Sequence, residues 1–211
     1  MPMSDDVLSG QPHREMREFD RPPADPVALL CAWLDEAVAG HVVLPQAMVL
    51  ATRDREGAPT TRTVAVKRWD ARGLVFGSNL SSRKADHLAR DPRAAGTFHW
   101  PQTMQQINVA GRVEHIEAHE SDELFLERPE AARATAVVSE QSAPLDDEAA
   151  LRTAAGKALR SGATGRRPSW WGGLRLVPDR IEFWQGGRDR LHRRLDYRRD
   201  DGHWSWRRLQ P

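Results

Sequence analysis

Residues 47–79, AMVLATRDREGAPTTRTVAVKRWDARGLVFGSN, consist of three short β-rich runs with turn-forming segments between them. The runs are AMVLAT (47–52), TRTVAVKRW (61–69) and LVFGSN (74–79), and the separating segments are DREGAP (54–59) and DARG (70–73). Runs of this kind, punctuated by Gly, Pro and Asp, are typical of strands joined in hairpins, which pair antiparallel. Two further strands are expected at Ala94–Trp100 and Gln105–Ile116.

Helices are expected on both sides of these strands. Asp25 and Pro26 form a helix start, the apolar residues from Val27 to Val38 recur at helical spacing, and Gly40 ends the run. A short helix is expected at Ser82–Asp91. Helical spacing returns over residues 120–160, with an irregular segment over residues 134–145.

Three closing strands are expected near the carboxyl end, within residues 173–187, 190–199 and 202–209. Turns are expected at Pro178-Asp179, Gly186-Gly187 and Asp201-Gly202. A doubly wound parallel sheet would need strands and helices to alternate throughout, which this chain does not do. The sequence therefore predicts an α+β fold, an antiparallel β-barrel with flanking helices.

Length and composition predict a single soluble domain. The chain has 211 residues, close to the usual domain size of about 100 to 200. Residues 1–20 are polar and broken by Gly10 and Pro12, so we expect a flexible amino-terminal arm and one domain over residues 21–211. The sequence has neither a signal-like apolar segment nor a membrane-spanning run, which predicts a cytoplasmic protein.

Charge and residue counts narrow the class of partner. A net charge of +1 excludes the overall basic field of a non-specific nucleic-acid binder. The single cysteine, Cys31, allows neither an intrachain disulfide nor a cysteine-based zinc site, and the scattered histidines lack metal-ligand spacing, so no metal is expected. The motifs GxGxxG, GxxxxGK[ST], HExxH and GxSxG do not occur.

Basic and hydroxyl residues at strand ends and turns form the first candidate site. Ser82-Arg83-Lys84 begins a predicted helix, where free N–H groups and the helix dipole favour a phosphate. A solvated first turn with ordinary surface charges is the alternative. Arg62 and Lys67 lie five residues apart and must leave opposite faces of a regular strand, so a bulge or the strand's end is needed to bring them together.

A second candidate feature is aromatic. Five of the eight tryptophans follow residue 169 and are accompanied by arginines; these tryptophans are Trp170, Trp171, Trp184, Trp204 and Trp206. The tryptophans could belong to the barrel core, covered by the aliphatic parts of the arginine side chains. Alternatively, tryptophans and arginines together could bind a flat anionic ligand by stacking and ion pairing. Single-stranded nucleic acid is a further flat anion, and its binding would be steeply salt-dependent.

Several motifs together resemble one family. They are PPADP (22–26), TRTVAVK (61–67), SNLSSRKADHL (78–88), the long segment from RPSWWGGLRL to HRRLDYRR (167–199) and the terminal RRLQP (207–211). In this order and spacing, over about Phe19 to Pro211, they resemble the pyridoxine (pyridoxamine) 5'-phosphate oxidase family. The resemblance implies an FMN-binding split barrel that forms a homodimer, with FMN between the subunits.

The resemblance also implies roles for individual residues. Around the FMN phosphate and ribityl chain it places Arg62, Lys67, Ser78, Arg83 and Lys84, and it places Gln106 against the flavin ring. From the second subunit it adds Gln141, Ser142, Trp184 and Arg194. The substrate would contact Lys67 and Arg128 and would be covered by Arg190 and His192, the expected catalytic residues: Arg190 would orient an acidic group and His192 would position the ring or relay a proton.

The departures from the vitamin enzyme's pattern concern the substrate. In LFLERPEAARA (124–134), Leu124 stands where that enzyme has tyrosine and Ala132 where it has serine, so two neutral donors to the substrate phosphate are missing. Each lost hydrogen bond to a charged group costs roughly 1.5 to 3 kcal/mol. The segments EFDRPPADPVALLCAW (18–33), AAGTFHWPQTMQQI (94–107) and DRLHRRLDYRR (189–199) are similar to the phenazine-biosynthesis branch of the family.

The expected activity is that of an FMN-dependent oxidase. It would take a hydride from a reduced nitrogen heterocycle, foremost a dihydrophenazine carboxylate, and pass the electrons to O2, giving H2O2. The alternative is a pyridoxine/pyridoxamine 5'-phosphate oxidase that makes pyridoxal 5'-phosphate, which Lys67 and the intact WGG and IEFWQGG segments favour. A flavin-binding protein without turnover is a second alternative.

Overall fold

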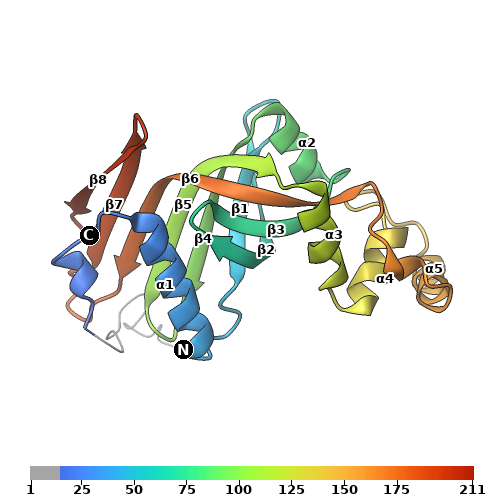
Figure 1. Cartoon of the computed structure of the whole chain (residues 1–211), viewed down its shortest axis with the longest axis horizontal. Helices are drawn as coiled ribbons and strands as arrows, with labels where there is room; N and C mark the ends of the chain where they lie inside the picture. The colour runs from blue at the N-terminus through green and yellow to red at the C-terminus, as the bar shows by residue number, and fades with distance from the viewer. Residues whose placement is uncertain (1–14) are drawn as a thin grey trace, which may run out of the picture.

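The computed structural model describes residues 15–211, which form eight β-strands arranged as one antiparallel sheet (Figure 1). The strands are β1 (Ala47–Arg53), β2 (Pro59–Asp70), β3 (Gly73–Asn79), β4 (Arg93–Trp100), β5 (Gln105–His115), β6 (Trp171–Gln185), β7 (Arg193–Asp200) and β8 (His203–Leu209). Their order is β3-β2-β1-β4-β5-β6-β7-β8, and β3 also pairs with β6. This additional pairing closes the first six strands into a barrel, which confirms the predicted fold class.

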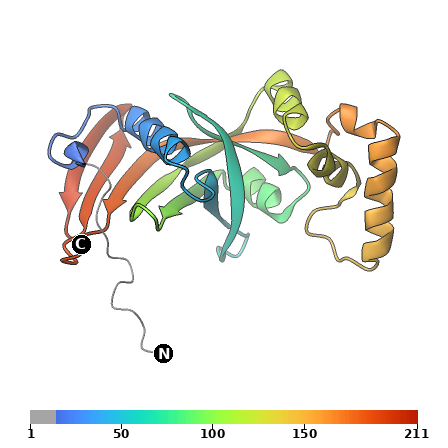
Figure 2. The ribbon, with the colours of Figure 1, turned by 90° about the horizontal axis from the view of Figure 1, so that it is seen from below.

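Five α-helices within residues 15–211 flank the barrel: α1 (Pro26–Ala39), α2 (Arg83–Arg90), α3 (Ala118–Leu126), α4 (Glu130–Val138) and α5 (Glu148–Arg160). The helix α1 begins as predicted, because the Asp25 carboxylate accepts hydrogen bonds from the N–H groups of Val27 and Ala28. Helices α3 to α5 gather at the end of the molecule opposite to β7 and β8 (Figures 1 and 2). None of the helices in the described part of the chain is long and apolar enough to span a membrane.

The strand β6 serves two parts of the sheet. Its first part, Trp171–Leu176, pairs with β3 and closes the barrel. Its last part, Arg180–Gln185, pairs with β7, which together with β8 extends the sheet beyond the barrel. One continuous strand therefore connects the helical end of the molecule with the carboxyl-terminal hairpin.

The turn predicted at Pro178-Asp179 is wrong, because β6 continues through these residues. The β5–β6 register shifts between Ala110 and Gly111, and Pro178 lies opposite Gly111. A bulge tolerates a proline, which has no N–H for the ladder. The backbones approach so closely here that a Cβ at Gly111 would lie 1.9 Å from the carbonyl oxygen of Val177.

The flexible arm predicted for residues 1–20 is wrong for its last part, and residues 1–14 lie outside the described residues. A 3-10 helix spans Arg17–Phe19, and the side chains of Met16 and Phe19 are 2% and 1% exposed. The guanidinium of Arg193 lies over the Phe19 ring at 4.9 Å, and Trp33 Nε1 donates to Glu18 at 2.7 Å. Residues 16–20 thus pack on α1 and on strand β7, far away in the sequence.

The segment 134–145, predicted to be irregular, is helical over its first five residues, because α4 continues to Val138. Ala134 is fully buried, and Ala136 belongs to an apolar cluster with Val75, Phe125 and Trp171. This cluster holds α3 and α4 against β3 and β6. Two members of the cluster, Ala136 and Trp171, also line the main pocket of the structure.

Candidate active site

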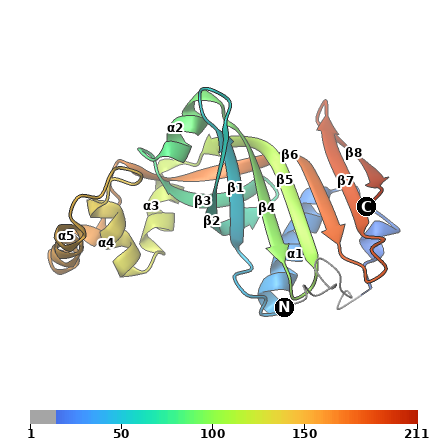
Figure 3. The ribbon, with the colours of Figure 1, turned by 180° about the vertical axis from the view of Figure 1, so that it is seen from behind.

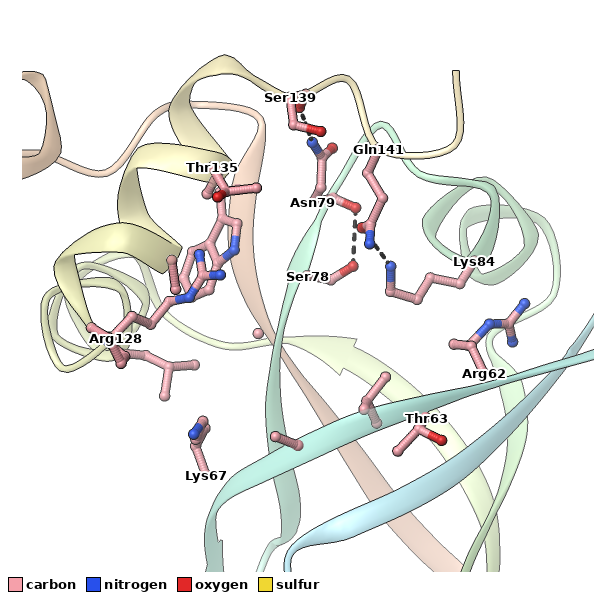
Figure 4. Close-up of a pocket in the computed structure, with 18 residues that line it drawn as sticks. Arg62, Thr63, Lys67, Ser78, Asn79, Lys84, Arg128, Thr135, Ser139 and Gln141 are labelled. Carbon is pink, nitrogen blue, oxygen red and sulfur yellow. Dashed lines mark hydrogen bonds between the residues drawn. The ribbon is translucent and has the colours of Figure 1, made fainter. Parts of the chain in front are cut away.

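A pocket of about 470 Å³ lies where β2 and β3 meet α2, α3 and α4 (Figure 4). Six of the site residues predicted from the sequence line it: Arg62, Lys67, Ser78, Lys84, Arg128 and Gln141. It is also lined by residues with no role predicted from the sequence, among them Asn79, Thr135 and Ser139. The Nδ2 of Asn79 donates to the carbonyl of Ser139 at 3.3 Å and so joins the end of β3 to the segment after α4.

One end of the pocket is cationic and rich in hydroxyl groups. The Nζ of Lys84 donates to Ser82 Oγ and to Gln141 Oε1, both at 2.9 Å, which uses two of its three N–H donors. Lys84 is only 7% exposed, and Arg62 lies beside it (Figure 4). Arg62 is held by Thr52 and Thr60, whose hydroxyls accept from its guanidinium at 2.8 and 3.0 Å.

The charges at this end repel one another. Burial, and then the neighbouring Arg62, lower the pKa of Lys84 to about 8. Burial, and then Arg83, lower the pKa of Arg62. No carboxylate of residues 15–211 is among these causes, so a bound anion would neutralise a cationic cluster that has no counter-charge.

The helix α2 adds a further anion-binding feature at the same place. It begins after Ser82, whose side chain makes no cap and instead donates to the carbonyl of Asn79 at 2.7 Å. The first N–H groups of the helix therefore have no side-chain acceptor from the N-cap, and Lys84 of this first turn lines the pocket. Arg83 itself is exposed and does not line the pocket, although its charge acts on Arg62.

The other end of the pocket combines a cation with apolar walls. The guanidinium of Arg128 lies 5.0 Å from the centre of the Trp171 ring, and its Nη1 is buried without a hydrogen-bond partner among the described residues. Burial lowers the pKa of Arg128. Leu124 and Ala132 also line the pocket, and Lys67 lies below Arg128 in Figure 4. A buried donor without an acceptor is costly, so this end is suited to an anionic ligand.

The ring of Trp171 fits against β3 only because residue 77 is glycine. A Cβ at Gly77 would lie 2.3 Å from the Trp171 ring. The ring can therefore lie close to β3 and contact the guanidinium of Arg128.

Arg62 and Lys67 leave opposite faces of β2, as strand geometry requires. Arg62 is half-buried on the inner side, and Lys67 is on the exposed side. The β2–β3 register shifts between Val66 and Arg68, so the bulge lies at Lys67. The bulge does not bring the two cations side by side, because they line different ends of the same pocket (Figure 4).

Five other predicted residues form a second group, away from the pocket, at the β7 end of β6. Gln106, Trp184 and Arg194 are direct cross-strand neighbours on β5, β6 and β7. The ring of His192 lies 4.9 Å from that of Trp184, and its Nδ1 accepts from the N–H of Gly187. Arg194 Nε donates to Glu182 at 2.7 Å, and Arg190 lies in the loop before β7 with a φ of +64°. We call Gln106, Trp184, Arg190, His192 and Arg194 the β6-end group.

Gln141 needs a correction to its expected origin. The sequence resemblance placed Gln141 and Ser142 in the site of a second subunit, but Gln141 bonds to Lys84 of its own chain. Ser142 follows it with a φ of +81° and is exposed, and it does not line the pocket. The segment after α4 therefore belongs to the same chain's pocket.

Three residues near Arg62 were not predicted from the sequence: Thr52 and Thr60 bond to its guanidinium, and His87 contacts these two threonines. Thr52, Thr60 and His87 come from β1, β2 and α2, and their spacing carries no motif. As regards metals, residues 15–211 contain no group of three or more His, Cys, Asp or Glu side chains that could hold an ion.

The residues present fit FMN. The cationic end has the unneutralised Arg62 and Lys84, hydroxyl groups and a helix N-terminus, which is the donor set that a phosphate monoester requires. The pocket volume is within the range of cofactor sites, about 300 to 1,000 Å³.

Solved structures share this fold. PhzG from Burkholderia lata 383, solved in complex with tetrahydrophenazine-1-carboxylic acid, is 38% identical, with a TM-score of 0.92 and coverage of 96% of this chain and 100% of that one. A pyridoxamine 5'-phosphate oxidase-related, FMN binding protein from Nostoc punctiforme shares the fold, with 22% identity, a TM-score of 0.66 and coverage of 87% and 96%.

Curated relatives and family descriptions agree with this. The pyridoxine/pyridoxamine 5'-phosphate oxidase of Herminiimonas arsenicoxydans is 40% identical over 98% of both chains, and that of Bordetella avium is 45% identical over 89% of this chain and 90% of its own. The family description "Pyridoxamine 5'-phosphate oxidase" matches residues 34–159, and "Pyridoxine 5'-phosphate oxidase C-terminal dimerisation region" matches residues 171–211. The chain therefore belongs to the pyridoxamine 5'-phosphate oxidase family of oxidoreductases, and this membership supports FMN as its cofactor.

Proposed function

We propose that this protein is an FMN-dependent oxidase that dehydrogenates a reduced, carboxylated nitrogen heterocycle, of which a dihydrophenazine carboxylate is the foremost candidate. The observation that carries the proposal is the environment of Arg128. Its buried Nη1 has no partner within residues 15–211, its guanidinium rests on Trp171, and Leu124 and Ala132 beside it offer no hydrogen bonds.

The cationic end of the pocket would hold the cofactor. Arg62 and Lys84 would bind the FMN phosphate, with Ser78 and the first turn of α2 beside it, and Gln141 would keep Lys84 in place. When bound, FMN supplies the hydride acceptor and returns the two electrons to O2, which with two protons becomes H2O2. The role of the protein is to fix the phosphate so that the ring system has one position.

The Arg128 end would choose the substrate. A carboxylate needs few donors and pairs with one guanidinium in a planar, bidentate way. A phosphate monoester carries up to two charges and three acceptor oxygens, and the two donors that Leu124 and Ala132 replace would be missing for it. Lys67 would contact a second polar group of the heterocycle, and the apolar wall would contact its rings.

A second copy of the chain would complete the site. Four of the five residues of the β6-end group, all except Gln106, lie in the part of the chain that matches the dimerisation region, residues 171–211. The outer face of the barrel between the two groups has small uncharged side chains in one cross-strand row, which is Thr63, Val49, Thr97 and Asn108. Val49 is 45% exposed there, and Figure 3 shows β1, β4 and β5 side by side on this face. Such a face suits a homodimer interface.

In that dimer, the partner's β6-end group would approach this chain's pocket. Trp184 and Gln106 would contact the flavin ring, and Arg194 would contact the cofactor's polar part. Arg190 would orient the substrate's acidic group, and His192 would hold the ring and accept or relay a proton. Because a nitrogen lone pair stabilises the oxidised product, no strongly basic side chain is needed.

Oxidation of pyridoxine or pyridoxamine 5'-phosphate is the second candidate. The observation in its favour is that curated relatives with this name are 40 to 45% identical over 89 to 98% of the chain. Lys67 and Arg128 would then share the substrate phosphate. A flavin-binding protein without turnover is the third candidate, and it would use the cationic end alone.

The test is anaerobic reduction of the FMN-loaded protein, offered a freshly reduced dihydrophenazine carboxylate, pyridoxine 5'-phosphate or pyridoxamine 5'-phosphate. We expect the yellow colour to bleach with the dihydrophenazine carboxylate, and air to restore it with one H2O2 per flavin. Bleaching by the B6 phosphates alone would establish the second candidate. If no compound bleaches the flavin, the protein binds the cofactor without turnover and the oxidase proposal is wrong.

A further inference from the structure

His87 lies behind Arg62 and outside the pocket. It is on α2, its side chain is 4% exposed, and its Nδ1 lies 3.1 Å from the hydroxyl of Thr52 and 3.5 Å from that of Thr60. These two hydroxyls are the ones that hold the Arg62 guanidinium, at 2.8 and 3.0 Å. A histidine, two threonines and an arginine from three different elements thus form one buried network that ends at the cationic end of the pocket.

The direction of the hydrogen bonds follows from the chemistry of the groups. Arginine is a donor only, so each threonine hydroxyl accepts from Arg62 and keeps its own hydrogen to donate. With its ring hydrogen on Nε2, His87 accepts from the Thr52 hydroxyl at Nδ1, 3.1 Å away. Donation then runs from Arg62 through Thr52 to His87. Each bond in such a chain polarises the next one.

The network fixes the orientation of the Arg62 guanidinium. Nη1 also donates to the backbone carbonyls of Leu50 and Thr60, at 3.1 and 3.0 Å, so the guanidinium is attached to β1 and β2 on one side. Its other side is left for the pocket. If Thr52 had no acceptor for its hydrogen, the hydroxyl could turn and donate elsewhere, and Arg62 would have a less defined position.

We infer that His87 is a positioning residue which, through Thr52, aims Arg62 at the cofactor phosphate and thereby sets the preference for FMN over unphosphorylated riboflavin. The inference rests on the proposed function in one respect, namely that Arg62 binds the phosphate. A purely structural His87 that only packs α2 on β1 would affect both flavins alike. The two roles therefore differ in a measurable ratio.

The experiment measures the dissociation constants of FMN and riboflavin by quenching of flavin fluorescence. The variants are His87→Asn, His87→Gln and His87→Leu in the full chain. Asn places its oxygen near the position of Nδ1, whereas Gln places its amide near Nε2. Comparing these two polar variants therefore shows which ring nitrogen of His87 matters. We expect His87→Leu and His87→Gln to bind FMN roughly tenfold more weakly with unchanged riboflavin affinity, and His87→Asn to restore FMN binding.

A second variant removes the intermediate link. Thr52→Val keeps the shape and loses the hydroxyl, and we expect the same loss of FMN preference. Adding His87→Leu to Thr52→Val should cost much less than His87→Leu alone, because residues in one network are not additive.

Two results would overturn the inference: equal weakening of FMN and riboflavin in His87→Leu or His87→Gln, or an unchanged FMN preference in both. If His87→Leu does not fold, the Asn and Gln pair decides alone. Arg62→Ala distinguishes failure of the inference from failure of the proposed function. If Arg62→Ala keeps the FMN preference, Arg62 does not bind the phosphate; if it loses that preference while His87→Gln keeps it, only the role of His87 is wrong.

Discussion

The pocket and the β6-end group differ in how their charges are compensated. In the pocket, Arg62 and Lys84 have pKa values lowered by burial and by neighbouring cations, and the buried Nη1 of Arg128 has no partner within residues 15–211. In the β6-end group, Arg194 is paired with Glu182, which raises the pKa of Arg194, and the rings of Trp184 and His192 lie 4.9 Å apart, tilted by 45°. The charges of the first region suit anions, and our proposal assigns a flat ring to the second region.

The largest expected effect is a loss of turnover when either the pocket or the β6-end group loses an arginine. Arg62→Ala in the pocket and Arg190→Ala in the β6-end group should each lower turnover by roughly 100-fold or more, because each removes charge-assisted bonds to a ligand. When the two inactive variants are unfolded, mixed in equal amounts and refolded, half of the dimers are mixed, and each mixed dimer has one intact site if sites are shared. Activity should then return to about a quarter of the wild-type value.

The control for this mixing experiment is each variant refolded alone, which should stay inactive. A mixture that also stays inactive, although mixed dimers are detected by mass spectrometry, would mean that each site is built within one chain.

The next largest effect distinguishes substrate binding at the Arg128 end of the pocket from FMN binding at the cationic end. Arg128→Ala should reduce kcat/KM for the preferred heterocycle by about 10- to 100-fold, since one bond to a charged group is worth roughly 1.5 to 3 kcal/mol. FMN affinity should change by less than about twofold, because the cofactor phosphate binds elsewhere. Arg128→Lys serves as the matched control, which keeps the charge and loses the planar fork. Equal losses of FMN affinity and turnover would remove the distinction between the ends.

A smaller effect should convert the substrate end. Leu124→Tyr with Ala132→Ser restores two hydroxyl donors and should raise kcat/KM for pyridoxine 5'-phosphate by about tenfold, at the expense of the carboxylated ring. Leu124→Phe with Ala132→Ser is the control, because it adds the ring of the tyrosine without its hydroxyl. If the phenylalanine variant gains as much as the tyrosine variant, shape and not hydrogen bonding decides the substrate.

The smallest effect concerns stability and pH. The folded pKa of Lys84, about 8, lies below the usual 10.5, so between these values the unfolded chain holds more protons than the folded one. The contribution of Lys84 to the stability of the FMN-free protein is therefore unfavourable below pH 8 and improves as the pH rises toward 10.5. Lys84→Met should unfold at a higher temperature than wild type at pH 7, and the difference should shrink by pH 10.

Calorimetry at both pH values tests this, and FMN supplies the control. Bound phosphate favours the charged lysine, so the order of the two proteins should reverse when FMN is present. A Lys84→Met variant that is less stable without FMN at pH 7 would contradict the view that the cations strain the empty pocket.

The parts of the fold that follow from local sequence were predictable. The Asp25-Pro26 helix start, the hairpins of residues 47–79 and the helix start at Ser82–Lys84 all depend on neighbouring residues, and the structure contains each of them. Anion binding at Ser82–Lys84 stays a prediction. The resemblance brought together Arg128 and Gln141, which no spacing connects. The substrate and the roles of Arg190 and His192 stay predictions.

The parts that depend on distant contacts were not predictable. Phe19 is buried because Arg193 and Arg208 lie over it, nearly the whole chain away in sequence. Pro178 looked like a turn, but its missing N–H falls at a bulge opposite Gly111, and the strand continues. The network of His87 is assembled by the pairing of β1 with β2 and by the packing of α2, and none of its members is unusual in its own segment.

The central claim is that the Arg128 end of the pocket prefers a carboxylated ring to a phosphorylated one. The most direct measurement is the rate of anaerobic flavin reduction, per concentration of substrate, for the dihydrophenazine carboxylate and for pyridoxine 5'-phosphate with one preparation of FMN-loaded protein. We predict a ratio of at least about tenfold in favour of the carboxylate, the worth of one missing bond to phosphate. A ratio in favour of pyridoxine 5'-phosphate would contradict the account and show that Lys67 and Arg128 suffice for a phosphate.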